Sequence, residues 1–185
     1  TTTSAVSATT ATLSWTAPAV LPSNGYEYEI RTSGLPGSGA IGLTTSGVTA
    51  AGVTTAVALG LTANTTYKNN ISSNYGSAVY SSWTTAYTFT TPCSSETLPL
   101  TQNFNVASTT ATSPVCWTQQ NVSGSLAIYQ TITSPGPSGT SPVAPIFEGS
   151  GMIFYNSYSN SVSLTRLVSP PIVTTGTAGV DVTFQ

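Results

Sequence analysis

The sequence has very few of the residues on which enzyme chemistry depends. It contains no histidine, two cysteines and one methionine, and only 4% of its 185 residues are charged, against about 25% in an average soluble protein. Without histidine a Ser-His-Asp triad cannot form, and a cysteine would lack the base that usually activates it. We therefore expect that the protein is not an enzyme and binds no cofactor.

The shortage of charge also limits the partners. The basic and acidic residues are Arg31, Lys68, Arg166, Glu27, Glu29, Glu96, Glu148 and Asp181. Three cations and a net charge of −2 cannot neutralise a phosphate backbone, so we expect no nucleic-acid partner. No apolar run approaches the roughly 18 residues that would cross a bilayer, so we expect no membrane insertion.

The carboxylates do not form an obvious catalytic or metal-binding group. Glu27 and Glu29 share one face of "GYEYEIRT", and Arg31 continues that face as a counter-charge, so a solvated strand face is the favoured interpretation. Asp181 and Glu148 leave calcium open as an alternative, although calcium sites usually gather several carboxylates.

The residues that are abundant favour β structure. Ser and Thr together make up about a third of the chain, and apolar and polar residues alternate in short runs bounded by turns. In "GYEYEIRT", Tyr26, Tyr28 and Ile30 share the other face. We predict an all-β protein of two antiparallel β-sandwich domains, over residues 1–92 and 93–185. The Gly-rich segment "GLPGSGAIG" (34–42) is predicted to be a flexible connection between strands.

A resemblance to a known family appears in the first half. Trp15 followed by Pro18, and "LTANTTY" with Leu61 six residues before Tyr67, resemble a fibronectin type III domain, with Ala63 where that family usually has proline. The resemblance implies that Tyr67 buries its ring and hydrogen-bonds its hydroxyl to nearby backbone. The alternation and the resemblance together predict one buried cluster, formed by Trp15, Tyr28, Ile30, Leu61 and Tyr67.

The second half resembles a different module. "ETLPLTQNFN", "PVCWTQQ", "GSGMIFYNS" and "LTRLVSPPIV" are similar to the MAM-like jelly-roll modules called choice-of-anchor J or cleaved-adhesin domains, which occur in secreted proteins of Bacteroidetes. Such modules are longer than residues 93–185, so we expect this one to be incomplete or to be completed from elsewhere.

The two cysteines, Cys93 and Cys116, do not form a CxxC motif, and no histidine could complete a zinc site with them. A disulfide between them is the favoured interpretation, and closing a loop of about 24 residues would contribute roughly 3 kcal/mol. Two unpaired buried thiols remain the alternative. A disulfide would fit a secreted or cell-surface protein.

Several positions are candidates for carrying or binding sugars. Three Asn-x-Ser/Thr sequons begin at Asn64, Asn70 and Asn121, and Ser108, Thr109 and Thr110 lie in a stretch suited to O-linked glycan. Covalent glycan would hydrate a polar surface that has almost no charge. The rings of Trp83, Tyr129 and Phe147 could stack on sugars, with packing in the core as the favoured alternative.

The last residues predict an assembly strand. In "GVDVTFQ", Val180, Val182 and Phe184 share one face, as in a half-buried strand whose edge needs a partner. Strand addition between chains would supply that partner and would give a homopolymer. The sequence therefore predicts a non-enzymatic extracellular structural or adhesive protein, the protomer of a bacterial surface fibre. The alternative is an accessory carbohydrate-binding segment of a larger secreted hydrolase.

Overall fold

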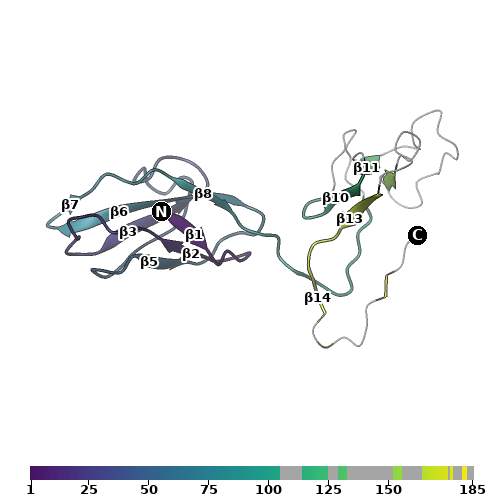
Figure 1. The fold of residues 1–185 in the computed structure, drawn as a ribbon, viewed down its shortest axis with the longest axis horizontal. Helices are drawn as coiled ribbons and strands as arrows, with labels where there is room; N and C mark the ends of the chain where they lie inside the picture. Colours follow the sequence, from purple (N-terminus) through teal and green to yellow (C-terminus); the bar gives the residue numbers. More distant parts are fainter. Residues whose placement is uncertain are drawn as a thin grey trace. The chain divides into compact units, whose positions relative to one another are not determined.

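The computed structural model describes residues 1–104, 114–124, 129–132, 152–155, 164–174, 176 and 181–182 (Figure 1). It divides into two compact units, Thr1–Ser94 and Ser95–Gln185. Every regular element among the described residues is a β-strand, which confirms the predicted all-β class. Each unit is described by itself below.

The first unit is a sandwich of two antiparallel sheets. One sheet has the order β1-β2-β5, and the other has the order β4-β3-β6, with β7 and β8 both paired with β6. The strands are β1 (Thr2–Ser4), β2 (Ala11–Ser14), β3 (Tyr26–Arg31), β4 (Leu43–Val48), β5 (Thr55–Ala58), β6 (Thr66–Gly76), β7 (Val79–Tyr80) and β8 (Tyr87–Thr90).

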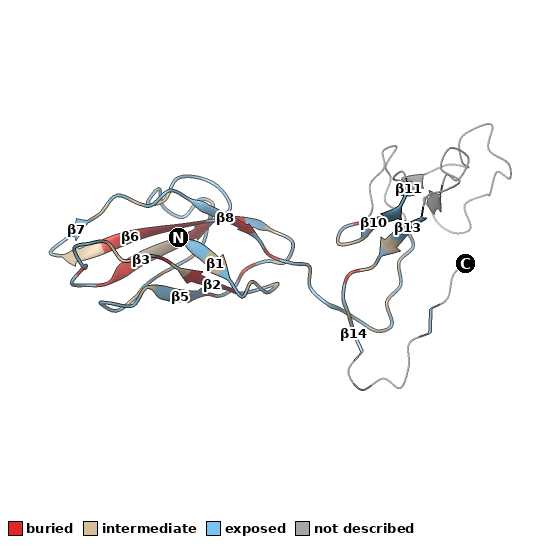
Figure 2. Ribbon diagram, viewed as in Figure 1, coloured by how far each residue is buried: buried red, intermediate tan, exposed pale blue. Residues whose placement is uncertain are grey.

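The core lies between these sheets because alternate residues of each strand point inward. Figure 2 shows the buried residues along β2, β3 and β6. The buried apolar residues are Ala11, Leu13, Trp15, Tyr26, Ile30, Ala58, Leu61, Tyr67, Ile71 and Phe89. Four of the five predicted core residues are in this cluster. The prediction for Tyr28 needs correction, because its ring is only partly buried and packs against the cluster. Tyr26 occupies the deeper position.

One of the hydrogen bonds at the corner that leads into β6 ends on the Tyr67 hydroxyl. The Thr62 N–H donates to the Tyr67 hydroxyl oxygen at 2.9 Å, which confirms the predicted bond between this hydroxyl and the backbone. The Tyr67 ring lies 5.8 Å from the Phe89 ring, centroid to centroid. Tyr67 therefore joins the turn after Leu61 to the core.

Trp15 and Tyr26 form the other aromatic contact of the core. Their rings meet edge to face with centroids 5.3 Å apart, an arrangement that aromatic pairs favour. The indole N–H of Trp15 and the hydroxyl of Tyr26 are buried without a hydrogen-bond partner among the described residues. Burial, with a smaller contribution from the neighbouring Tyr75, raises the pKa of Tyr26, so its phenol stays neutral.

One amide side chain ties the short strand β1 to the opposite sheet. Asn69 of β6 is fully buried, and its Nδ2 donates to the Thr3 hydroxyl at 3.0 Å. The Oδ1 of the same amide is buried without a partner among the described residues, so the bond from Nδ2 is the one that offsets the burial of this side chain. The bond therefore holds β1 near the side of the sandwich formed by β8, which β1 also contacts.

The second unit contains three two-stranded sheets among its described residues. The pair β9–β14 is parallel, whereas β10–β13 and β11–β12 are antiparallel. Their strands are β9 (Glu96–Thr97), β10 (Thr118–Ser123), β11 (Tyr129–Ile132), β12 (Met152–Tyr155), β13 (Leu164–Val168) and β14 (Ile172–Val173). The Phe104 and Trp117 rings meet edge to face at 5.3 Å.

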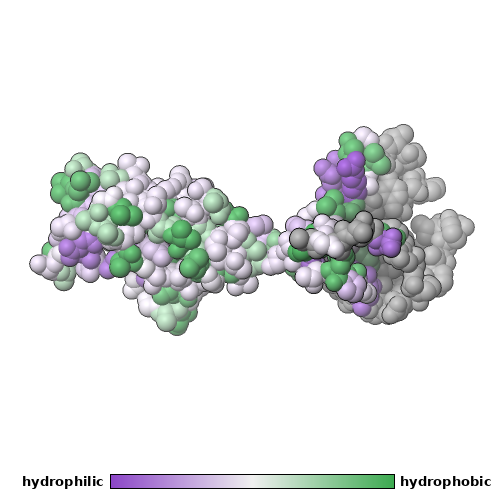
Figure 3. Space-filling model, turned by 90° about the horizontal axis from the view of Figure 1, so that it is seen from below, coloured by the Kyte–Doolittle hydropathy of each residue, from purple (hydrophilic) through white to green (hydrophobic). Residues whose placement is uncertain are grey.

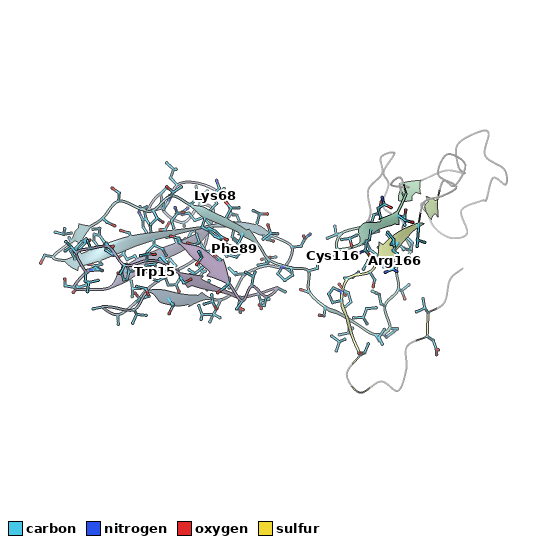
Figure 4. The ribbon with its side chains drawn as sticks, in the orientation of Figure 1. Trp15, Lys68, Phe89, Cys116 and Arg166 are labelled. Atoms are coloured by element: carbon cyan, nitrogen blue, oxygen red, sulfur yellow. The ribbon has the colours of Figure 1, made fainter. Side chains whose placement is uncertain are left out.

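The disulfide prediction is confirmed, because Cys93 and Cys116 are bonded to each other and no cysteine is free. These are the only cysteines of the chain. The bond closes the loop that the sequence predicted, and the alternative of two unpaired thiols is excluded. Figure 4 marks Cys116.

The two core tyrosines give a matched prediction. Tyr67→Phe removes the acceptor of the Thr62 N–H and should destabilise the first unit by about 0.5–1.5 kcal/mol, the usual net contribution of one hydrogen bond. Tyr26→Phe removes a hydroxyl that has no partner, so it should be neutral or slightly stabilising. Urea unfolding at pH 7, followed by tryptophan fluorescence, measures both. Equal losses in the two variants would contradict the difference in hydrogen bonding.

Candidate functional site

The outer face of β3 carries a buried ion pair. The Arg31 side chain is fully buried and its Nε lies 2.6 Å from Glu29 Oε2, while Glu29 retains 13% exposure. A guanidinium can be buried only when its donors are paired. The predicted counter-charge is therefore present, but the expectation of a solvated strand face is wrong at Arg31.

The remaining donors of Arg31 hold the loop between β3 and β4. Arg31 Nη1 donates to the Ile41 carbonyl oxygen at 2.9 Å, and Nη2 donates to the Gly39 carbonyl oxygen. From the other side, the Gly37 N–H donates to Glu29 Oε2 at 3.0 Å. The segment predicted to be a flexible connection is thus tied to the ion pair at three points. The sequence analysis did not predict that the ion pair holds this loop, although an arginine shortly before a Gly-rich loop was the available signal.

Trp83 lies beside the same loop. A Cβ added to Gly37, which has a φ of +76°, would come within 3.2 Å of Trp83 Nε1, so the glycine allows the indole to approach the loop closely. Trp83 is half-buried, so this ring is neither a core residue nor a fully exposed platform for sugar. Tyr129 lies in β11, and Phe147 lies outside the described residues.

These contacts bear on whether Glu27 and Glu29 could act as a catalytic pair. Glycoside hydrolysis needs two carboxyls that face a substrate and exchange protons with it. Glu29 instead accepts hydrogen bonds from Arg31 and from the loop backbone. The geometry therefore assigns Glu29 a structural role.

A cleft of about 280 Å³ opens next to the Trp15 side of the core. It is lined by Thr1, Trp15, Thr16, Pro18, Ile71, Ser73, Tyr75, Ser81 and Thr84. Two of its hydroxyls already support the backbone of β6, because Ser81 Oγ accepts from the Ser73 N–H at 2.9 Å and Thr84 Oγ1 accepts from the Ile71 N–H at 3.0 Å. The lining is aromatic and hydroxylated and carries no charged side chain, and nothing in the sequence pattern pointed to it.

The candidate glycosylation sites differ in accessibility. Asn64 lies exposed in the turn before β6, and Asn121 is exposed in β10. The prediction that Asn70 could carry a glycan is wrong, because this residue is buried. Its Nδ2, the atom to which the sugar would be attached, donates a hydrogen bond to the Thr84 carbonyl oxygen at 2.8 Å. Ser108, Thr109 and Thr110 lie outside the described residues.

The last residues are described only in part. Asp181 and Val182 are exposed and lie outside any strand, whereas Val180 and Phe184 are outside the described residues. Glu148 is also outside them. Within the described ranges no three metal-ligating side chains come together, and no helix there is long and apolar enough to cross a membrane. The assembly strand and the calcium alternative stay predictions.

The visible surface of the first unit is mostly of intermediate hydropathy, with separate apolar spots and few strongly hydrophilic ones (Figure 3). This agrees with the absence of any charged residue between Arg31 and Lys68. Large aliphatic side chains are exposed in that stretch, including Val48 at 72% and Ile41 at 87%. Surface of this kind favours contact with another neutral surface over contact with an ion.

Comparisons with known proteins give structural neighbours only. No protein-family model and no curated protein matches the chain. A computationally redesigned β-sandwich protein is 25% identical, with 50% of this chain and 89% of that chain covered and a TM-score of 0.39. The chicken CNTN1 FN1–FN3 domains are 15% identical, with 49% of this chain and 30% of that chain covered and a TM-score of 0.41. The β-sandwich assignment stands on the two sheets and the core between them.

The ion pair predicts a contrast between neighbouring glutamates. Glu29→Gln should destabilise the first unit by about 3 kcal/mol, because it leaves the buried Arg31 without its counter-charge. Glu27→Gln, on the same face but without an ion pair among the described residues, should change stability by less than about 0.5 kcal/mol. Urea unfolding of both variants measures the difference, and amide exchange of Gly37 should quicken in the first variant alone. Similar behaviour of the two variants would show that the ion pair does not support the loop.

Proposed function

We propose that this chain is a non-enzymatic extracellular structural or adhesive protein, a protomer of a bacterial surface fibre that assembles through contacts between strands of neighbouring copies. The observation that carries the proposal is the low charge of the first unit's surface. Of the four charged residues there, Arg31 and Glu29 form an ion pair with each other, and residues 32–67 carry no charge. Such a surface suits close packing of identical subunits, because no like charges have to meet.

The domain types belong to the same proposal. The Tyr67 hydroxyl bond and the Trp15 core position support a fibronectin type III domain for residues 1–92, a module that typically serves as a spacer or a binding surface. We propose a MAM-like jelly-roll module for residues 93–185 on the sequence motifs alone. The disulfide supports a secreted or cell-surface location, where such bonds persist.

The fibre proposal predicts a visible assembly. Electron microscopy of the native material should show fibres, and the purified 185-residue chain should form species larger than a monomer as its concentration rises. Dispersed monomers in both preparations would contradict the proposal.

The cleft favours the alternative function, an accessory carbohydrate-binding segment of a larger secreted hydrolase. Sugar sites commonly combine an aromatic ring with hydroxyl groups, and Trp15, Tyr75 and the surrounding Ser and Thr residues supply both. Titration with neutral oligosaccharides would then shift the backbone amide resonances of Ser73, Tyr75 and Ser81. Fibres without such shifts would favour the structural function, and saturable shifts without fibres would favour the binding function.

Glycan on the surface is a further part of the proposal, because a neutral extracellular surface needs hydration that charge does not supply. Asn64 and Asn121 are exposed, and the Ser/Thr stretches offer O-linked positions. The intact mass of native material should exceed the 18.9 kDa of the bare polypeptide. Enzymatic or chemical deglycosylation should return the mass to that value, and an unmodified mass in native material would refute the claim.

A further inference from the structure

The edge of β4 offers hydrogen-bonding groups that the first unit does not use. β4 is the terminal strand of its sheet and pairs with β3 alone. The Thr49 N–H donates to the Tyr26 carbonyl oxygen at 2.8 Å, and the same register pairs Gly47 with Tyr28. Since alternate residues of an edge strand bond to the neighbour, Thr45 and Gly47 bond to β3. The N–H and C=O groups of Ser46 and Val48 therefore point outward.

The strand is kept regular by its neighbour. A Cβ added to Gly47 would come within 2.6 Å of the Tyr28 hydroxyl, so the tyrosine ring lies directly over the glycine. An aromatic side chain that covers a glycine on the adjacent strand stabilises an edge strand which the glycine alone would weaken. This also explains why Tyr28 is only partly buried. Its ring supports β4 at the margin of the core.

The usual protections of a sheet edge are missing from β4. Natural edges carry lysine, proline, inward charges or a covering loop, and the sequence of β4, "LTTSGV", contains neither charge nor proline. Its one irregularity in pairing with β3 lies at the Leu43 end, between Ile30 and Arg31. The strand from Thr45 to Val48 is thus regularly paired with β3, carries no charge, and is exposed at Ser46 and Val48.

The second sheet leaves its edge open on the same side of the sandwich. β5 ends the order β1-β2-β5, and because β1 contacts β8 at one side of the sandwich, β5 and β4 are the edge strands of the opposite side. Val57 of β5 and Val48 of β4 are 55% and 72% exposed. Both strands fall within the uncharged stretch 32–67. This side therefore combines open backbone groups with an apolar flank.

We propose that the β4 edge is a self-association site, in which β4 pairs antiparallel with β4 of a second copy of this chain about a two-fold axis. The outward backbone groups of an exposed edge strand are hydrogen-bonded to water, and another extended strand can replace that water along the whole row. A two-fold axis brings each copy's neutral edge against an identical neutral edge without like-charge repulsion. The inference deepens the proposed function, because it names the second copy as the partner. A two-fold joint closes on itself, so a fibre needs a further contact elsewhere in the chain.

The test uses proline at an outward position. Ser46→Pro removes one outward N–H from each copy and leaves the ladder with β3 intact, since edge strands accept proline where the N–H faces away from the sheet. Sedimentation velocity of the 185-residue chain should show a concentration-dependent dimer, and Ser46→Pro should weaken dimerisation about tenfold or more, as expected for the loss of symmetric hydrogen bonds. Ser46→Lys should do the same by placing like charges face to face. Ser82→Lys, at an exposed position on the segment beside β6, is the control and should leave dimerisation unchanged.

Amide hydrogen exchange locates the contact. Raising the concentration of the wild-type chain should slow exchange at Ser46 and Val48, while Thr45 and Gly47 are protected at every concentration by their bonds to β3. A dimer with this protection supports the inference whether or not fibres form. Fibres that persist in Ser46→Pro, together with rapid exchange at Ser46 and Val48 of the wild-type chain at high concentration, would overturn the β4 joint and leave the proposed function standing. A chain that is monomeric at all concentrations would overturn both, and urea unfolding of each variant verifies that the unit is folded.

Discussion

The burial of the Arg31 guanidinium is the constraint on which the surface of the first unit depends. A buried cation needs all of its donors paired, and this one is paired with Glu29 and with two carbonyl groups of the loop that follows it. The loop is held against the sheet as a result, and it delivers the chain into β4 at a fixed place. The pairing of one charge and the backbone ladder with β3 together place β4.

Inside the sandwich, polar groups of the core fall into two kinds. The Tyr67 hydroxyl and the Asn69 amide nitrogen have partners and connect segments that are distant in sequence. The Trp15 indole N–H and the Tyr26 hydroxyl have none among the described residues. The first kind fixes the arrangement of the strands, whereas the second kind costs stability and is tolerated because the rings bury a large apolar area.

A chain with so little charge needs other means of keeping its surface hydrated and the edges of its sheets protected. Charged side chains normally keep proteins apart and protect the edges of sheets. Here residues 32–67 contain none, and the two edge strands β4 and β5 both fall in that stretch. Hydration by glycan and association with a second copy would each compensate for the missing charge. The two are compatible when the sugars lie away from β4. Exposed Asn64 in the turn before β6 is suited to such a position.

The sequence by itself determined the all-β class, the disulfide and most of the core, because these follow from local alternation, from the number of cysteines and from the spacing of Trp15, Leu61 and Tyr67. It could not determine which member of an alternating face lies deepest, so it placed Tyr28 in the core where the structure has Tyr26. It also placed Arg31 in solvent and Asn70 on the surface. Both errors have one cause: burial on the outer face of a sheet depends on which segments cross it. The loop after β3 and the segment after β7 cover these side chains, and only tertiary structure decides where such segments lie.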